Sequence, residues 1–192
     1  MITKENTTYL STRQQLREWL TENSRTQPFL NVPISIKPKP ETILYLDLVE
    51  ECLCFGWIDG IKKKIDEDTL VQRITPRKKR SNWTELNKER VRRMEKLGLM
   101  TEHGRAVLPD MSEKSFVINK EILEALQQEE QTYKNFLSMP TLYQRIRIDT
   151  IQGYDGTKSK ELFEKRLEKF IENTKNNKMY GDWHDGGRLV DY

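Results

Sequence analysis

A change of hydrophobic period at Gly56 constrains the fold of this chain more than any other feature. Before Gly56, apolar residues in 41–55 recur at helical spacing and form one broad face. After it, residues 57–65 alternate with a period of two, and a second strand-like run, 69–75, follows an acidic turn. The pattern therefore predicts a helix that ends at a glycine and leads directly into an antiparallel hairpin.

The segment before this helix predicts one helix and one strand. Ser11 has Gln14 three residues later, a capping-box spacing, so a short amphipathic helix is expected over 11–23. Residues 27–36 alternate well enough to form a strand. Pro33 cannot donate a backbone hydrogen bond, so we expect this strand to lie at an edge or to be broken there.

From Asn119 onward the patterns are helical only. The sequence therefore predicts an α+β fold, with a small antiparallel sheet of about three strands packed by helices and a C-terminal all-helical part. The expected division is an α+β core over 1–108, a linker over 109–118, a helical part over 119–180 and an irregular, glycine-rich tail over 181–192.

Composition excludes several classes of protein. The longest apolar runs are only a few residues, so no transmembrane segment is expected, and the first residues lack the apolar core of a signal peptide. A cytoplasmic location is the resulting expectation. Cys52 and Cys54 are too close together for a structural disulfide or a four-ligand zinc site, and the chain has only 2 His. We therefore expect buried cysteines, no metal site and no cofactor.

Positive charge is concentrated in the middle of the chain. Residues 60–97 hold 13 Lys or Arg against 6 Asp or Glu, whereas the remainder holds 20 against 24. Four consecutive cations, residues 77–80, come directly before a helix expected over 83–97, with Ser81 or Asn82 as its cap. A helix start with adjacent cations is a place where phosphate or carboxylate can bind.

Individual roles follow from this placement. Arg77 and Arg80 could bind an anion through two hydrogen bonds each, and Trp83 could stack on a ring. The alternative is a solvated loop in which Ser81 only caps the helix and Trp83 belongs to the core. Asn87 lies one turn beyond Trp83, where it could hydrogen-bond back to the loop or make no functional contact.

The hairpin supplies a second candidate cluster. Trp57 and Asp59 share a strand face that is more polar than a core face requires. Asp59 could orient Arg73 or Arg77, or act as a general base. The alternative is a surface ion pair, which stabilises by only about 0–1 kcal/mol.

These motifs resemble those of a known family. The residues that carry the resemblance are the run 49–59, the run 72–77, Ser81, Asn82, Trp83, Asn87, the run 98–100 and, in the helical part, the run 143–145. Together they resemble the YdeI or OmpD-associated family, which is named for bacteriocin protection. The resemblance implies an association with stress or antimicrobial resistance, and it implies no catalytic residue.

Two hypotheses for the function follow. The first is a binding or protective protein whose basic hairpin-to-helix pocket takes an anionic, phosphate-bearing ligand: a nucleotide, a nucleic acid or a cell-envelope phosphate. Its predicted ligand-binding residues are Trp57, Arg73, Arg77, Arg80, Ser81, Asn82, Trp83 and Asn87. The second is a small-molecule enzyme with Asp59 as acid or base and Arg77 as the substrate anchor.

Overall fold

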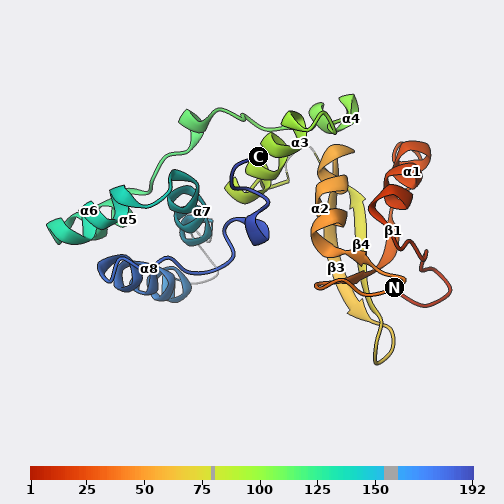
Figure 1. Cartoon of the computed structure of the whole chain (residues 1–192), viewed down its shortest axis with the longest axis horizontal. Coiled ribbons are helices and arrows are strands. Elements are labelled where there is room, and N and C mark those ends of the chain that lie inside the picture. Colours follow the sequence, from red (N-terminus) through yellow and green to blue (C-terminus); the bar gives the residue numbers. More distant parts are fainter. Residues whose placement is uncertain (79–80, 154–159) are drawn as a thin grey trace. The chain divides into compact units, whose positions relative to one another are not determined.

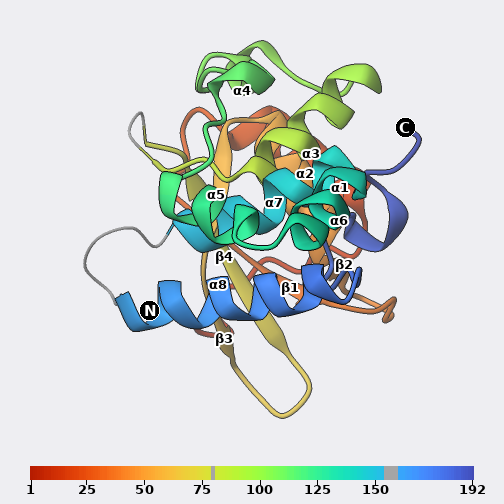
Figure 2. The same cartoon turned by 90° about the vertical axis from the view of Figure 1, so that its left-hand side faces the viewer.

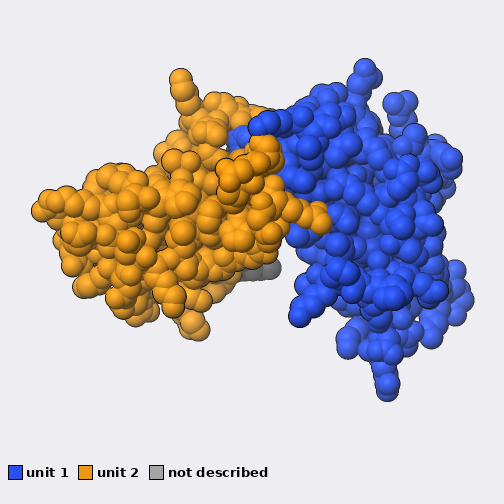
Figure 3. Space-filling view, in the orientation of Figure 1, with its two compact units in different colours: residues 1–82, 90–109 blue, residues 83–89, 110–192 orange. Residues whose placement is uncertain are grey.

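The computed structural model describes residues 1–78, 81–153 and 160–192. The chain forms two compact units (Figure 3). Unit 1 comprises Met1–Asn82 and Arg90–Pro109, and unit 2 comprises Trp83–Glu89 and Asp110–Tyr192. The domain boundaries expected from the sequence stay a prediction.

Unit 1 is built on a four-stranded sheet with the order β2-β1-β4-β3. Strands β1, β3 and β4 are labelled in Figure 1. The strands are β1 (Leu30–Ser35), β2 (Ile43–Leu44), β3 (Trp57–Lys64) and β4 (Leu70–Pro76). The antiparallel pairs β1–β4 and β4–β3 confirm the α+β class. The expected number of about three strands misses β2, which pairs in parallel with β1. Two residues are too few to show an alternating pattern in a sequence.

Pro33 lies within β1, a strand that has β4 on one side and the short β2 on the other. On one side it pairs with Val71 of β4. On the other side β2 pairs only with Ile34 and Ser35, so β1 has a single neighbour at the level of the proline. The expectation of an edge position is therefore correct for Pro33 itself but not for the whole strand.

Helix α2 (Tyr45–Cys54) packs against β3 and β2 of this sheet, and helices α1 (Arg13–Asn23) and α4 (Glu102–Arg105) pack against α2. The N-cap of α1 is Thr12, whose side chain forms a capping box with Gln15, and not Ser11 with Gln14 as expected. Gly56 ends α2 with a φ of +71°, as the sequence predicted. The buried apolar residues include Leu16, Leu20, Val32, Leu48, Leu53, Trp57, Val71 and Ile74.

The β3–β4 hairpin contains a bulge. Asp59 pairs with Ile74 and Lys62 pairs with Gln72, so Gly60 and Ile61 stand opposite a single residue of β4. The Gln72 side chain donates to the carbonyls of Gly60 at 2.8 Å and Ile61 at 3.2 Å. Because the bulge shifts the alternation, the single face expected for residues 57–65 is not continuous.

Helix α3 (Glu85–Lys96) has its residues 85–89 in unit 2 and its residues 90–96 in unit 1. It starts two residues later than expected. Neither Ser81 nor Asn82 caps it, because the Thr84 hydroxyl accepts the Asn87 backbone N–H at 3.2 Å. The carboxylate of Asp149 accepts the Glu85 N–H at 3.0 Å, which satisfies another free donor at this helix start.

The rest of unit 2 is helical (Figure 2). Its elements are η1 (Glu113–Ser115), α5 (Lys120–Gln127), α6 (Glu130–Ser138), α7 (Thr141–Gln152), α8 (Lys160–Lys175) and η2 (Asp185–Gly187). The core comprises Ile122, Leu126, Phe136, Met139, Tyr143, Ile148, Ile151 and Phe170. The tail also contributes, because Tyr180 and Trp183 pack against this core.

No helix among the described residues is long and apolar enough to cross a membrane, and the cytoplasmic location stays a prediction.

Candidate anion-binding site

A small pocket lies at the end of the β3–β4 hairpin in unit 1. Its volume is about 270 Å³, and it is lined by Ile58, Thr75, Pro76, Lys78 and Ser81. Lys78 is exposed, whereas Thr75 and Ser81 are half-buried. The pocket therefore combines one ammonium and two hydroxyl groups with two apolar walls. Ammonium and hydroxyl groups are the donors that phosphate oxygens accept from.

Arg77 supports the chain around this pocket. Its backbone N–H donates to the Gly56 carbonyl at 2.9 Å, which extends the hairpin pairing by one bond. Its guanidinium NH1 donates to the Asn82 carbonyl at 3.0 Å and lies 3.4 Å from Ser81 Oγ. The residue is only 6% exposed. Burial lowers the pKa of Arg77, and the negative charge of Asp59 opposes this shift.

Ser81 closes the loop in front of the pocket. Both its hydroxyl and its backbone N–H donate to the Lys78 carbonyl, at 2.7 and 3.0 Å. Asn82 is exposed, and its carbonyl accepts from Arg77. Arg80 lies outside the described residues, so its predicted role in anion binding stays a prediction.

Asp59 and Arg73 lie on opposite faces of the sheet. Asp59 Oδ2 accepts the Tyr45 hydroxyl at 2.8 Å, on the side of α2. Arg73 pairs with Asn31 in the adjacent strand, and its Nε donates to Asn31 Oδ1 at 2.8 Å. Its guanidinium carbon lies 4.4 Å from the centre of the Phe29 ring. Of the two expected partners for Asp59, Arg73 lies on the other face of the sheet, and a role of Asp59 in orienting Arg77 stays a prediction.

Trp57 has a structural role in unit 1. Its side chain is 0% exposed, and its Nε1–H donates to the Ser24 carbonyl at 3.1 Å. The ring packs edge-on against Trp19, with ring centres 5.8 Å apart. Trp83 and Asn87 belong to unit 2, and their predicted contacts with a ligand stay a prediction.

Sequence reasoning missed part of the pocket. Lys78 belongs to the cationic run 77–80, but the sequence alone does not distinguish it from the neighbouring cations. Ile58 and Thr75 are not predictable as lining residues, because only the pairing of β3 with β4 places them opposite each other. Tyr45 belongs to the helix predicted over 41–55, and nothing in the sequence indicates that its hydroxyl is the donor to Asp59.

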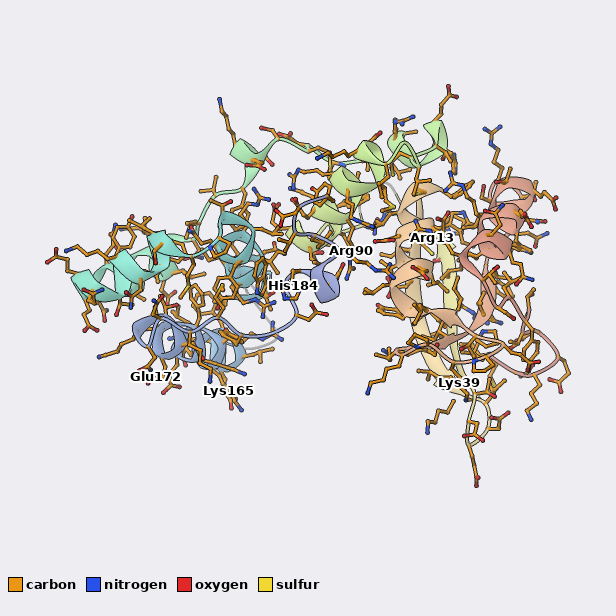
Figure 4. The ribbon with its side chains drawn as sticks, viewed as in Figure 1. Arg13, Lys39, Arg90, Lys165, Glu172 and His184 are labelled. Carbon is orange, nitrogen blue, oxygen red and sulfur yellow. The ribbon has the colours of Figure 1, made fainter. Side chains whose placement is uncertain are left out.

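A buried ionic network in unit 1 was also not predicted. Glu50 and Glu51 of α2 are 1% and 0% exposed. Arg13, labelled in Figure 4, donates to Glu50 at 2.5 Å and to Glu51 at 2.7 Å. Arg17 donates to Glu51 at 2.9 Å, and Arg93 donates to Glu50 at 2.6 Å. The network joins α1, α2 and α3 through charge-assisted hydrogen bonds.

The two cysteines are buried and free, as expected. Burial is the largest cause that raises the pKa of both thiols, to about 12 for Cys54. The described residues contain no group of three or more His, Cys, Asp or Glu that could hold a metal ion.

Two family models match the chain. The model described as "Domain of unknown function (DUF8412)" matches residues 8–107, slightly more than half of the sequence. The chain belongs to the DUF8412 family. The model described as "Bacteriocin-protection, YdeI or OmpD-Associated" matches residues 115–177. No curated protein and no solved structure matches.

The second match confirms the resemblance to the YdeI or OmpD-associated family and locates it. Residues 115–177 contain α5 to α8, including the run 143–145. The motifs of residues 49–100, which also suggested this family, lie in the DUF8412 segment, as does the whole pocket beside Arg77.

Proposed function

We propose that this protein is a binding protein that takes a phosphate-bearing anion at the pocket of Thr75, Lys78 and Ser81. The observation that carries the proposal is the pocket itself, which combines an exposed ammonium with two hydroxyl groups beside a buried arginine. The Lys78 ammonium and the Thr75 hydroxyl can donate to an oxyanion, and the Ser81 hydroxyl can do so by exchanging its bond to the Lys78 carbonyl.

The electrostatic environment supports the same ligand. Residues 60–97 carry 13 Lys or Arg against 6 Asp or Glu, so the potential around the hairpin end attracts anions. Burial disfavours the charge on Arg77. An anion in the adjacent pocket would offset part of this cost, because Coulomb interactions are stronger where water is excluded.

The size of the pocket limits what it can hold. Its volume of about 270 Å³ is below the ~300–1,000 Å³ typical of pockets that enclose a whole small molecule. The pocket therefore suits a phosphate group whose remaining part, such as a nucleoside or an envelope polymer, stays outside.

Isothermal titration calorimetry with inorganic phosphate, pyrophosphate and a nucleoside triphosphate tests the proposal. Lys78→Ala should weaken binding roughly tenfold, since it removes a charge-assisted hydrogen bond. Ser81→Ala should weaken it less. Lys37→Ala is the matched control, because Lys37 is also an exposed lysine of unit 1 and lies outside the pocket lining. Equal affinities of the Lys78 and Lys37 variants would refute the proposal.

Retention on heparin resin tests the predicted cations together. Arg80→Ala with Lys78→Ala should lower both the salt concentration at elution and the slope of affinity against salt. Arg77→Ala is less suited to this purpose, because it also removes the hydrogen bond to the Asn82 carbonyl that orders the loop.

The enzymatic alternative assigns Asp59 as acid or base and Arg77 as the substrate anchor. Its support is the hydrogen bond from Tyr45 to the Asp59 carboxylate, together with the favourable electrostatic interaction between this carboxylate and the Arg77 charge. Asp59 lies on the opposite strand face from Ile58, which lines the pocket. Asp59→Asn should therefore leave phosphate affinity unchanged within about twofold if the pocket is a binding site only.

We place this binding function in the cytoplasm. We also propose that it serves the protection against bacteriocins for which the matching family is named. Survival of a bacteriocin-sensitive strain that expresses either the native chain or the Lys78→Ala variant tests this link. Equal protection by both proteins would show that protection does not depend on the anion pocket.

A further inference from the structure

Unit 2 contains a groove between α5 and α8 that is separate from the anion pocket. Its volume is about 810 Å³. Ala125 of α5 and Leu167 and Ile171 of α8 supply its apolar lining, and all three are half-buried. Leu167 and Ile171 also pack against the core of unit 2. The apolar part of the groove is therefore an exposed continuation of the core.

Three glutamates border this apolar lining. Glu164, Glu168 and Glu172 are exposed, line the groove and recur every four residues along α8. At 3.6 residues per turn they form one row along the helix, directly beside Leu167 and Ile171. The edge of the groove closest to its apolar lining is therefore acidic.

Two lysines lie further from the lining. Lys165 and Lys169 also line the groove, and Lys165 is labelled with Glu172 in Figure 4. Helical spacing places both lysines one row beyond the glutamates, away from Leu167. The ammonium of Lys169 lies 5.0 Å from the centre of the Tyr180 ring, an interaction that holds it against the tail. At the start of α8, the Lys160 ammonium lies 3.7 Å from the Glu164 carboxylate. The acidic character of the row therefore comes mainly from Glu168 and Glu172.

We propose that this groove binds a cationic amphipathic helix of a partner protein. The apolar stripe of such a helix would cover Ala125, Leu167 and Ile171, and its lysines or arginines would reach the glutamate row. Binding of an amphipathic helix in an apolar groove is a recurrent mode of peptide recognition. The acidic row repels anionic lipid headgroups, so a protein segment fits this surface better than a membrane surface does.

The experiment uses the full chain and a synthetic peptide of leucine and lysine with helical spacing, followed by fluorescence anisotropy. Binding should be measurable and should weaken as salt is raised. The triple change Glu164→Lys, Glu168→Lys and Glu172→Lys should weaken it roughly tenfold or more, since attraction becomes repulsion at three positions. A matched leucine–glutamate peptide should bind the native chain less tightly than the leucine–lysine peptide.

The control has the same change of charge in unit 1. Glu18→Lys, Glu22→Lys and Glu67→Lys alter three exposed glutamates outside the groove lining, and this variant should bind the peptide as the native chain does. Ala125→Gln is a second test of the groove, because it adds bulk to the side formed by α5 without changing the charge and keeps a good helix former. It should also weaken binding roughly tenfold.

Equal binding by the groove and control variants would overturn the proposal, as would equal binding of the acidic and basic peptides. Binding of anionic phospholipid vesicles that is lost in the Ala125→Gln variant, without peptide binding, would assign the surface to a membrane instead. Lys78→Ala should leave peptide affinity unchanged. The groove and the anion pocket can therefore fail independently.

Discussion

The Tyr45 hydroxyl on α2 donates a hydrogen bond of 2.8 Å to Asp59 Oδ2 on β3. The bond joins the helix before Gly56 to the strand after it. Asp59 also lies close enough to Arg77 to stabilise the charge of its buried guanidinium. The Asp59 carboxylate therefore accepts a hydrogen bond from Tyr45 and stabilises the charge of Arg77. The hydrogen bond connects the start of β3 to α2.

Because of the environment of Tyr45, the free energy of unfolding should fall as the pH rises into the alkaline range. Burial first, and the Asp59 carboxylate second, raise the pKa of Tyr45 above its ordinary value of 10.0. The folded state therefore keeps a proton that the unfolded state loses above this pH. The resulting contribution is complete below pH 10.0 and is lost as pH rises further.

Tyr45→Phe should therefore flatten the fall in the free energy of unfolding at alkaline pH, although it lowers stability near neutral pH by about 1 kcal/mol. Urea unfolding at a series of pH values measures both effects. Tyr9→Phe is the control, because Tyr9 is 58% exposed. An unchanged alkaline slope in the Tyr45 variant would contradict the assignment.

The buried glutamates of α2 predict a large effect on stability. Glu51 accepts from Arg13 and Arg17 on α1, and its side chain is 1% exposed. Glu51→Gln removes the charge and leaves two partly buried guanidinium groups facing a neutral amide. Loss of one partner in a buried ion pair should lower the free energy of unfolding by about 3 kcal/mol. Glu18→Gln, on the exposed side of α1, should change it by less than about 0.5 kcal/mol.

A substitution of Trp57 distinguishes a structural role of this residue from a role in ligand binding. Trp57→Phe leaves a cavity and removes the hydrogen bond to the Ser24 carbonyl, so stability should fall by about 2 kcal/mol. Phosphate affinity should not change, because the indole is fully buried. Parallel calorimetry and urea unfolding measure the two quantities. A fall in phosphate affinity without a loss of stability would instead support the prediction from the sequence that Trp57 contacts the ligand.

Local patterns were sufficient to predict most of the fold. The break at Gly56, the hairpin and the helical second half all follow from hydrophobic period and from glycine, and each needs only neighbouring residues. The errors concern features that depend on distant residues. Strand β2 forms because it meets Ile34 and Ser35 of β1, and the start of α3 is stabilised by Asp149, far along the chain.

The candidate site was predictable to a similar extent. The cationic run identified the hairpin end, where Arg77 and Ser81 do lie together. The sequence could not show that Asp59 and Arg73 lie on opposite faces, because this depends on the register of β3 and β4. It also gave no reason to pair Glu51 with Arg13, since the two residues meet only when α1 packs against α2.

Gly104 gives a final prediction about the packing of α4 in unit 1. A Cβ atom at this position would lie 2.2 Å from the Cys54 carbonyl oxygen, at the end of α2. The obstacle is backbone, which cannot rotate away, and the same carbonyl accepts the Thr101 hydroxyl at 2.6 Å. Gly104→Ala should therefore displace α4 and lower the free energy of unfolding by about 3 kcal/mol.

The control for this variant is Gly60→Ala. A Cβ at Gly60 would meet only the Arg73 carbonyl oxygen, at the ordinary contact distance of 3.5 Å. Its effect should stay within about 0.5 kcal/mol. Urea unfolding followed by tryptophan fluorescence compares the two variants. If both lose the same stability, the close approach of α4 to the end of α2 does not limit the residue at position 104.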